Sequence, residues 1–477
     1  MITVLLIIVP VLTGFISFFV KDEKSVKTLA VFSAVATLVI SLISLFQNTS
    51  SVTFDASWLP MMGSRFTVSL DGMGKMLTLL TAVSFPVIFA STYNNHYKSP
   101  NAFYGFMLLT QAGLMGVFCA MDLLLFYFFW ELALIPAYFL CSKWGGEKRI
   151  PVTFKFFIYT FIGSLLMLVG ILFINFKTPD HSFAIASLRN LSLTAGQENF
   201  AFWLFFIAFA IKMPVFPFHT WQPDTYEQAP TAVTMVLSGV MVKMGVFAVI
   251  RWILPMLPDA SARMADVVMI VAITGMIYVS LIAIREDDIK RLIAYSSIAH
   301  IGLMAASMFT GNAIGMQGVI FQMFAHGVNI IGLWIVVDVI EQQMGTRKFS
   351  ELGGLAQKAP ALAILFVIMA FANIALPLTN SFVGEFLMFN SVFNHSKILG
   401  AVAAISIILA AVYTLWMVQK IFYGEVRGAE EIHLKVPSNT RLMLVILVAV
   451  VLIFGVYPQP MINLTSDTVT KIIAQIK

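Results

Sequence analysis

Charged side chains are scarce in this sequence. Asp, Glu, Lys and Arg make up 11% of its 477 residues, whereas hydrophobic residues make up 59%. The mean hydropathy is +0.90, which exceeds what the interior of a soluble domain requires. This scarcity of charge argues against a soluble enzyme and favours a chain that lies almost entirely in a lipid bilayer. Because lipid offers no partners for backbone N–H and C=O groups, we expect an all-α polytopic membrane protein.

Cysteines and glycine-rich phosphate-binding motifs are also lacking. The two cysteines, Cys119 and Cys141, form no CxxC or CxxH pattern, which argues against a disulfide framework, an iron–sulfur cluster or a zinc site. The sequence contains no dinucleotide fingerprint. His219, His300 and His326 could serve as haem ligands, but nothing in their surroundings requires a porphyrin. We therefore expect no cofactor in this chain.

What the sequence does have is a series of apolar runs of about 20 residues, the length that crosses a bilayer. They predict about 14 transmembrane helices. The approximate ranges are 3–20, 28–47, 75–94, 102–119, 122–141, 153–175, 200–221, 229–253, 265–284, 290–309, 314–338, 360–390, 400–422 and 441–460. The first run lacks the basic flank and cleavage site of a signal peptide, so we expect it to remain as a span.

Lysines and arginines predict the orientation of these spans. If the N-terminus is placed outside, most of the 29 basic residues fall into loops on one side of the membrane. The positive-inside rule then puts both termini on the non-cytoplasmic side. The net charge of +5 reflects this loop bias, and we expect no nucleic-acid partner.

Prolines interrupt two of the predicted spans beside a charged residue. Pro214 and Pro217 follow Lys212, and Pro377 precedes Glu385. An isolated proline in a span is usually a simple kink, but a broken helix beside a charge is typical of a polar cavity at membrane depth. We expect two broken helices, in spans seven and twelve.

The offset of five spans between the two breaks predicts an inverted repeat, because an odd offset reverses the orientation of the second unit. We therefore expect spans four to eight, residues 101–254, to form the first five-helix repeat. Spans nine to thirteen, residues 255–424, would form the second. Residues 1–100 would supply three N-terminal helices and residues 425–477 the last span.

Four charged side chains lie deep within apolar runs, namely Glu131, Lys212, Lys243 and Glu385. A charge at the middle of a bilayer costs about 3 kcal/mol on insertion scales, so four of them indicate a function. If Glu131 stays close to Lys212, the lysine keeps its proton. If the two separate, desolvation favours the neutral amine, which would release its proton towards Lys243.

His300 and His326 could bridge the distance between Lys243 and Glu385, which would make the charges a proton relay. Two simpler interpretations remain open. The charges could be structural ion pairs that dock helices in a passive scaffold, particularly Glu131 with Lys212. Each imidazole could also be satisfied by a neighbouring carbonyl.

Several long blocks of this sequence, in the same order along the chain, resemble the antiporter-like subunits of respiratory complex I, the NADH:quinone oxidoreductase. The blocks are residues 126–136 with Trp130-Glu131, 212–224, 227–230 with the following Lys243, 287–302 and 380–386. Glutamate at position 385 resembles the M type, the counterpart of mitochondrial subunit four, because the L and N types usually carry lysine there. An acidic residue often found on span four of relatives has no counterpart here, where Gln111 is the strongly polar residue.

The resemblance implies a proton-translocating unit in the membrane arm of a complex in the bacterial inner membrane. Glu131 and Lys212 would be its essential pair, Lys243 its central lysine and Glu385 its exit residue. FMN, iron–sulfur clusters and quinone would belong to partner subunits, with L-type and N-type chains and small membrane subunits as neighbours. Two alternatives share the same residues: the large subunit of a multisubunit Na⁺/H⁺ antiporter and a subunit of a ferredoxin- or hydrogenase-linked membrane complex.

Overall fold

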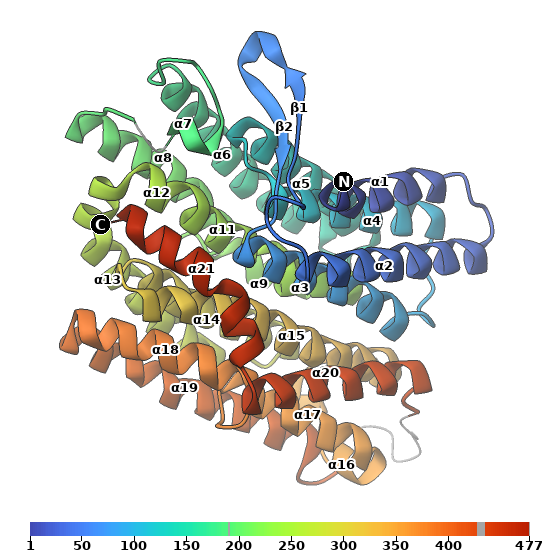
Figure 1. Cartoon of the computed structure of the whole chain (residues 1–477). Helices are drawn as coiled ribbons and strands as arrows, with labels where there is room; N and C mark the ends of the chain where they lie inside the picture. Colours follow the sequence, from blue (N-terminus) through green and yellow to red (C-terminus); the bar gives the residue numbers. More distant parts are fainter. Residues whose placement is uncertain (189–190, 427–434, 477) are drawn as a thin grey trace.

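Helices run through nearly the whole chain (Figure 1). The computed structural model describes residues 1–188, 191–426 and 435–476. The first helices are α1 Ile2–Ser17, α2 Glu23–Leu45, α3 Gly72–Ser91, α4 Pro100–Cys119, α5 Leu123–Trp144, α6 Arg149–Asn175, α7 Ile185–Leu188, α8 Ala195–Lys212, α9 Trp221–Gln228, α10 Thr231–Val236, α11 Lys243–Ala248 and α12 Leu254–Met256. The others are α13 Pro258–Ala283, α14 Ile289–Met308, α15 Ala313–Met344, α16 Leu355–Lys358, α17 Pro360–Asn373, α18 Asn380–His395, α19 Lys397–Phe422, α20 Ser438–Val456 and α21 Gln459–Ile476.

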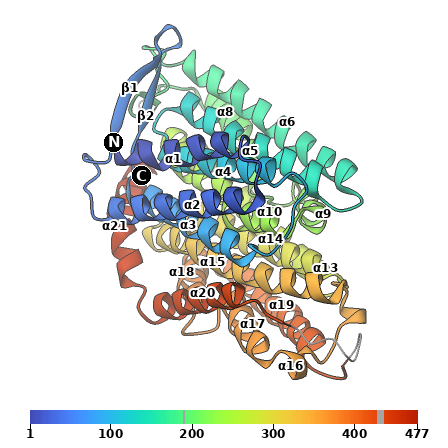
Figure 2. The ribbon, with the colours of Figure 1, turned by 90° about the vertical axis from the view of Figure 1, so that its right-hand side faces the viewer.

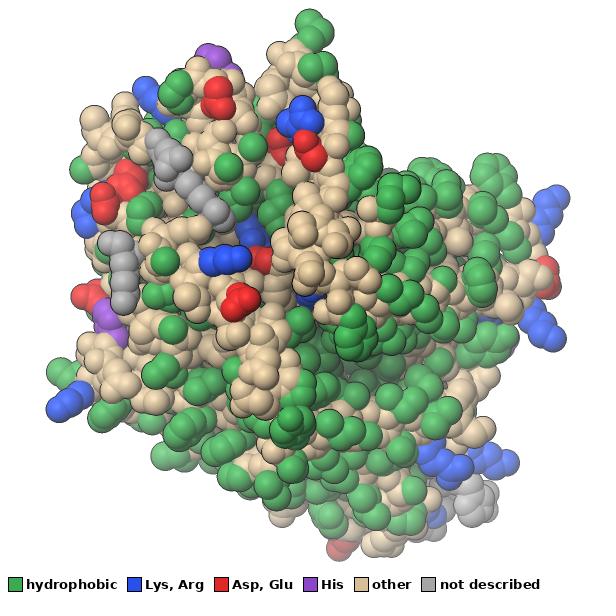
Figure 3. Space-filling view, in the orientation of Figure 1, with side chains coloured by type: hydrophobic (Ala, Val, Ile, Leu, Met, Phe, Trp, Pro, Cys, Tyr) green, Lys and Arg blue, Asp and Glu red, His purple; other side chains and the backbone are tan. Residues whose placement is uncertain are grey.

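Within the described residues, ten helices are long and apolar enough to cross a membrane, and α1 and α17 are shorter apolar helices. Two of the ten, the continuous segment Thr231–Met256 and α15, are buried along their whole apolar windows. By contrast, α2, α19 and α20 expose most of theirs. Figure 3 shows hydrophobic side chains covering much of the face over α2 and α20, as expected for a surface in contact with lipid. The prediction of a predominantly helical membrane protein is confirmed.

Both predicted helix breaks lie at the prolines. Helix α8 ends at Lys212, and α9 begins at Trp221 after a non-helical segment that contains Pro214 and Pro217. The indole of Trp221 donates to the carbonyl of Ile211, 2.9 Å away, which satisfies an acceptor that the end of α8 leaves free. A side chain of the protein therefore replaces the missing helical hydrogen bond.

The second break is built in the same way. Helix α17 ends at Asn373 and α18 begins at Asn380, with Pro377 between them. The side-chain amide of Asn329 donates to the carbonyl of Ala372 at 3.3 Å. As at the first break, the polar backbone at the interruption is met inside the protein, as membrane depth requires.

The segment Thr231–Met256 departs from α-helical geometry twice, at Leu237–Met241 and at Val249–Ile253, which are both π-helical. Such turns carry one extra residue and occur often at functional sites. The sequence analysis predicted a continuous α-helix here. Lys243 lies two residues after the first π-helical turn, so the departure affects the direction of the most buried lysine.

Two further elements were not predicted. Strands β1 Phe54–Leu59 and β2 Ser64–Val68 pair in an antiparallel hairpin, which projects beyond the helices in both ribbon views (Figures 1 and 2). The expectation of a purely helical chain is therefore wrong for residues 54–68. Helix α21 follows the last predicted span, buries one face and packs against α3 and α15. Its polar opposite face explains why hydropathy did not predict it as a span.

Candidate functional site

Lys243 is the most buried of the four predicted charges, with no exposed surface. Its ammonium nitrogen donates to the carbonyl of Ser238 at 2.5 Å and lies 2.8 Å from Nδ1 of His326. Ser238 is on the same segment, whereas His326 is on α15, whose apolar window is completely buried. The lysine is thus held between a backbone acceptor and an imidazole at the centre of the bundle.

From His326 the polar contacts continue into the second half of the chain. The rings of His326 and His300 lie with their centroids 5.4 Å apart, and Nδ1 of His300 is 2.8 Å from Oε1 of Glu385. The amide of Gln322 also approaches that carboxylate, at 3.3 Å. The structure therefore brings together Lys243, His326, His300 and Glu385, from α11, α15, α14 and α18, in one row.

Glu131 and Lys212 are arranged differently. They make no ion pair within 4 Å of each other, and in the described part of the chain neither Oε1 of Glu131 nor Nζ of Lys212 has a hydrogen-bond partner. The ammonium of Lys212 instead lies 5.6 Å from the centre of the Trp130 ring, within the range of a cation–π interaction. The two side chains therefore form no direct ion pair in this structure.

Buried polar atoms along the row lack protein partners. Nε2 of His300 and Nε2 of His326 are both buried and unpaired among the described residues. A cavity of about 20 Å³ borders His300 and Glu385, together with Ser406 and Tyr413. A space of that size next to polar groups suits a single water molecule. Because these imidazole nitrogens have no partner among the described residues, proton transfer along the row would need internal water between the side chains.

His219, the third histidine considered in the sequence, lies elsewhere. Its ring packs against Phe216 and Tyr278, in the non-helical segment between α8 and α9. None of its described contacts involves His300 or His326. The structure therefore does not bring the three histidines together.

Other buried charges were missed by the sequence analysis. Arg251 makes two hydrogen bonds of 2.7 Å to the Asp71 carboxylate, and Lys75 donates to the carbonyls of Leu45 and Gln47. These residues are close to the ends of their spans, where a charge usually reaches the membrane surface. The available signals were an arginine within a predicted span and an aspartate just before an earlier one.

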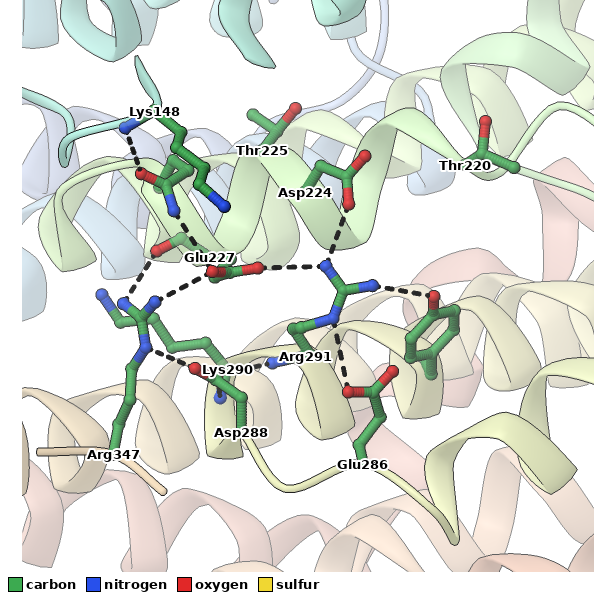
Figure 4. Close-up of polar contacts among 12 residues, drawn as sticks. Lys148, Thr220, Asp224, Thr225, Glu227, Glu286, Asp288, Lys290, Arg291 and Arg347 are labelled. Carbon is green, nitrogen blue, oxygen red and sulfur yellow. Dashed lines mark hydrogen bonds and ion pairs between the residues drawn. The ribbon is translucent and has the colours of Figure 1, made fainter. Parts of the chain in front are cut away.

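At the other end of α3 and of the Thr231–Met256 segment is a network of ion pairs (Figure 4). Arg291 contacts Asp224, Glu227 and Glu286, at distances of 2.9 to 3.3 Å. Arg347 contacts Glu227 as well. The network joins α9, which follows the first break, to α14, which carries His300.

Burial and ion pairing act in opposite directions on the carboxylates of this network. Burial raises the pKa of Asp224, but hydrogen bonds and charges from Lys155 and Arg291 outweigh it, so the pKa lies below its ordinary value. Burial raises the pKa of Glu286, and the neighbouring Arg291 offsets only part of that rise. Asp224 is therefore the more firmly ionised of the two.

Beside the network lies a cavity of about 800 Å³, which we call the vestibule. Its wall includes Asn95, Glu227, Thr231, Lys290, Asp338 and Glu341. Lys290 pairs with Glu341 at 2.6 Å, and Asn95 donates to the Asp338 carboxylate at 3.1 Å. The vestibule therefore combines space for water with several carboxylates, of which Asp338 and Glu341 lie at the end of the buried helix α15.

Comparisons with known proteins identify the family of this chain. Residues 120–410 match the family described as NADH:quinone oxidoreductase/Mrp antiporter, TM. The chain is 36% identical to NADH-quinone oxidoreductase subunit M of Rhodobacter capsulatus, over 94% of this chain and 91% of the relative. It is 33% identical to F(420)H(2) dehydrogenase subunit M of Methanosarcina mazei, over 96% and 95% of the two chains.

Among solved structures, a chain of respiratory complex I from Thermus thermophilus with bound NADH superposes with a TM-score of 0.91. The two are 28% identical, and the match covers 99% of this chain and 100% of the other. Sequence and structure thus match over nearly the full length. The chain belongs to the NADH:quinone oxidoreductase/Mrp antiporter transmembrane family.

Proposed function

We propose that this chain translocates protons as an M-type subunit in the membrane arm of a respiratory NADH:quinone oxidoreductase. The observation that carries the proposal is the row Lys243, His326, His300 and Glu385, because buried groups that exchange protons are linked from the centre of the bundle into its second half. The names of the relatives support the choice of complex. Partner subunits would carry FMN, iron–sulfur clusters and quinone, and would include L-type and N-type chains.

The proposed topology has fourteen spans, if each broken helix is counted once, in two inverted repeats of residues 101–254 and 255–424. Residues 1–100 and 425–477 flank the repeats. The breaks at the ends of α8 and α17, each near a predicted charge, support this division. We place the vestibule at the cytoplasmic face and both termini on the opposite side, because of the basic loops at the vestibule end.

In the proposed cycle, Glu131 and Lys212 act as a switch on the row. When they are separated, the unpaired ammonium is costly, and Lys212 releases its proton towards Lys243. Approach of Glu131 restores the charged lysine, and that positive charge opposes a proton on Lys243. A proton then leaves Lys243 through His326 and His300 to Glu385. Moving one charge against about 150 mV costs about 3.5 kcal/mol, which quinone reduction elsewhere would have to supply.

The proposal is tested with Lys212→Met and Glu131→Gln in the purified complex, reconstituted into vesicles. We expect each variant to assemble and to lose proton translocation by about tenfold or more, since each removes one arm of the switch. Lys148→Met, which removes an exposed charge at the vestibule, is the matched control. A passive scaffold would instead fail to assemble, and normal translocation in both variants would reject the switch.

The similarity to an F(420)H(2) dehydrogenase subunit leaves the electron donor to be identified. Mass spectrometry of the subunits that co-purify with this chain would identify it. Partners with iron–sulfur and NADH-binding motifs would support the NADH:quinone assignment. Small membrane partners alone would indicate a Na⁺/H⁺ antiporter and reject the respiratory assignment.

A further inference from the structure

A second cavity lies at the vestibule end of the bundle, where α4 begins and α5 ends. Its volume is about 420 Å³. Trp144 borders both this cavity and the vestibule, and its indole donates to the backbone carbonyl of Lys98. This contact joins the end of α5 to the segment before α4. We call the space the basic pocket, because of the side chains that line it.

The charged side chains of the basic pocket are all positive. Lys98, Lys143 and Arg149 line it, and within the described residues no carboxylate does. In the described part of the chain, none of the three pairs with an acidic side chain. Glu147, the nearest acidic residue in the sequence, borders the vestibule instead. The pocket therefore combines three positive charges that no described carboxylate balances.

Two helices also begin at the pocket. Helix α4 starts at Pro100 and α6 at Arg149. Among the described residues, neither N-cap side chain, Ser99 or Lys148, makes a capping hydrogen bond. The N-terminal end of a helix carries a partial positive charge and N–H groups that lack helical partners. Both ends add to the charge of the three side chains and favour an anion.

Aromatic rings support one of the lysines. The ammonium of Lys143 lies 5.9 Å from the ring centre of Phe106 and 5.8 Å from that of Phe139. The two rings stack, with their centroids 5.3 Å apart. A cation–π interaction holds an ammonium group in place without neutralising it. Lys143 is therefore positioned and still available to a negatively charged ligand.

The pocket adjoins an exposed apolar strip on α6. Ile150 lines the pocket and is 61% exposed, and Phe154, one turn further along, is 60% exposed. Phe161 continues the strip, and only 39% of the apolar window of α6 is buried. This helix lies at the edge of the bundle in Figure 2. A molecule in the pocket therefore meets positive charge at the helix ends and apolar side chains along α6.

We propose that the basic pocket binds the phosphate of an anionic phospholipid, whose acyl chains lie along the apolar strip of α6. Phosphate oxygens accept hydrogen bonds from ammonium and guanidinium groups, and a guanidinium can donate two at once. Basic pockets between spans on the cytoplasmic side bind such headgroups. An acidic segment of a partner subunit or a free phosphate would match the charges but not the apolar strip. A lipid matches both.

This site lies outside the proposed relay, and the inference does not rest on it. One bound headgroup would contact the start of α4, the end of α5 and the start of α6. Of these helices, α5 carries Glu131. The lipid would therefore hold together three helix ends without touching a residue of the relay.

The test uses the intact complex in vesicles that contain a photoreactive analogue of phosphatidylglycerol, with the reactive group on an acyl chain. After illumination, mass spectrometry of peptides locates the label on this chain. We expect labelling within residues 150–161. The matching analogue of phosphatidylcholine, whose headgroup has no net charge, should label these residues about tenfold less.

The triple variant Lys98→Gln, Lys143→Gln and Arg149→Gln removes the three charges from the pocket. We expect labelling of residues 150–161 by the phosphatidylglycerol analogue to fall by about tenfold or more, because each basic residue near the membrane surface adds to the binding of an anionic lipid. If the triple variant does not assemble, Arg149→Gln alone decides, with an expected fall of about threefold. Arg149→Lys keeps the charge and should stay within about twofold of the unaltered complex.

The matched control removes three charges from exposed positions in other loops, by Lys21→Gln, Lys24→Gln and Lys420→Gln. Labelling within residues 150–161 should not change in this variant. An equal fall in the control would show a general effect of surface charge and would reject the site. Equal labelling by the two lipid analogues would reject it as well, and so would unchanged labelling in Arg149→Gln and the triple variant.

The other two occupants give different results. Loss of labelling on addition of inorganic phosphate would show a site for the free anion. Carbodiimide cross-linking of Lys98 or Lys143 to a carboxylate of a partner subunit would show that protein fills the pocket. Either result would overturn the proposal. Because labelling needs no turnover, a complex with Lys212→Met that no longer translocates protons should still be labelled, which separates this inference from the proposed function.

Discussion

The two halves of the proposed relay differ in how their charges are partnered. From Lys243 to Glu385 each group lies next to the following one, at hydrogen-bond distance or in ring contact. By contrast, Nζ of the buried Lys212 and Oε1 of the half-buried Glu131 have no hydrogen-bond partner among the described residues. Linked groups are suited to passing a proton on. An unpaired buried charge is costly, so the first pair is suited to responding to a change elsewhere.

The largest effect is expected at Glu385, the last residue of the linked half, which runs from Lys243 to Glu385. Glu385→Gln keeps the size of the side chain and one accepting oxygen, but the amide cannot take up a proton. We expect assembly to be normal and proton translocation to fall by about tenfold or more, because the row loses its last acceptor. The measurement is the initial rate of acidification or alkalinisation in vesicles after NADH is added.

Glu425→Gln is the matched control, since it makes the same substitution at an exposed position after α19. It should translocate normally. Undiminished translocation in Glu385→Gln would mean that the linked half is a structural hydrogen-bond network, and the contrast between the halves would lose its functional meaning.

The sequence predicted the charged residues of both halves and the positions of the two breaks. A charge within a long apolar run is rare and stands out, and so does a proline beside it. The linkage between residues was not predictable, because the contact of His326 with Lys243 depends on how α15 packs. The π-helical turn before Lys243 was not predictable either, because its residues carry no distinctive sequence pattern.

The second test removes the ion pairs that join α9, next to the first helix break, to α14, which carries His300. Arg291 on α14 holds Asp224 and Glu227 on α9. Arg291→Met would leave these carboxylates with fewer partners, and we expect the complex to lose about 3 kcal/mol of stability. Arg291→Lys keeps the positive charge but not the two parallel hydrogen bonds of a guanidinium. Its stability should therefore lie between that of the unaltered complex and that of Arg291→Met. The measurement is thermal dissociation of the purified complex.

The pH dependence of the same network has a defined sign. Because the pKa of Asp224 is lower in the folded chain than its ordinary value, this carboxylate stabilises the fold above its unfolded pKa of about 4. That contribution is lost as the pH falls through the lower folded value. Arg291→Met should therefore lose less stability on acidification than the unaltered complex. An equal loss in both would show that Asp224 owes its low pKa to Lys155 alone.

The smallest effect is expected within the linked half, at a position that water can replace. His300→Gln removes an imidazole that can carry a charge, yet glutamine keeps polar atoms near Glu385, and water can bridge the remaining gap. We expect a fall of about twofold in proton translocation, measured as for Glu385→Gln. His395→Gln, whose ring pairs with Asp266 outside the row, is the control. A loss as large as that of Glu385→Gln would show that direct contact between side chains, not water, carries the proton past this point. The linked half would then depend on its geometry as strictly as the unpaired half depends on its charge.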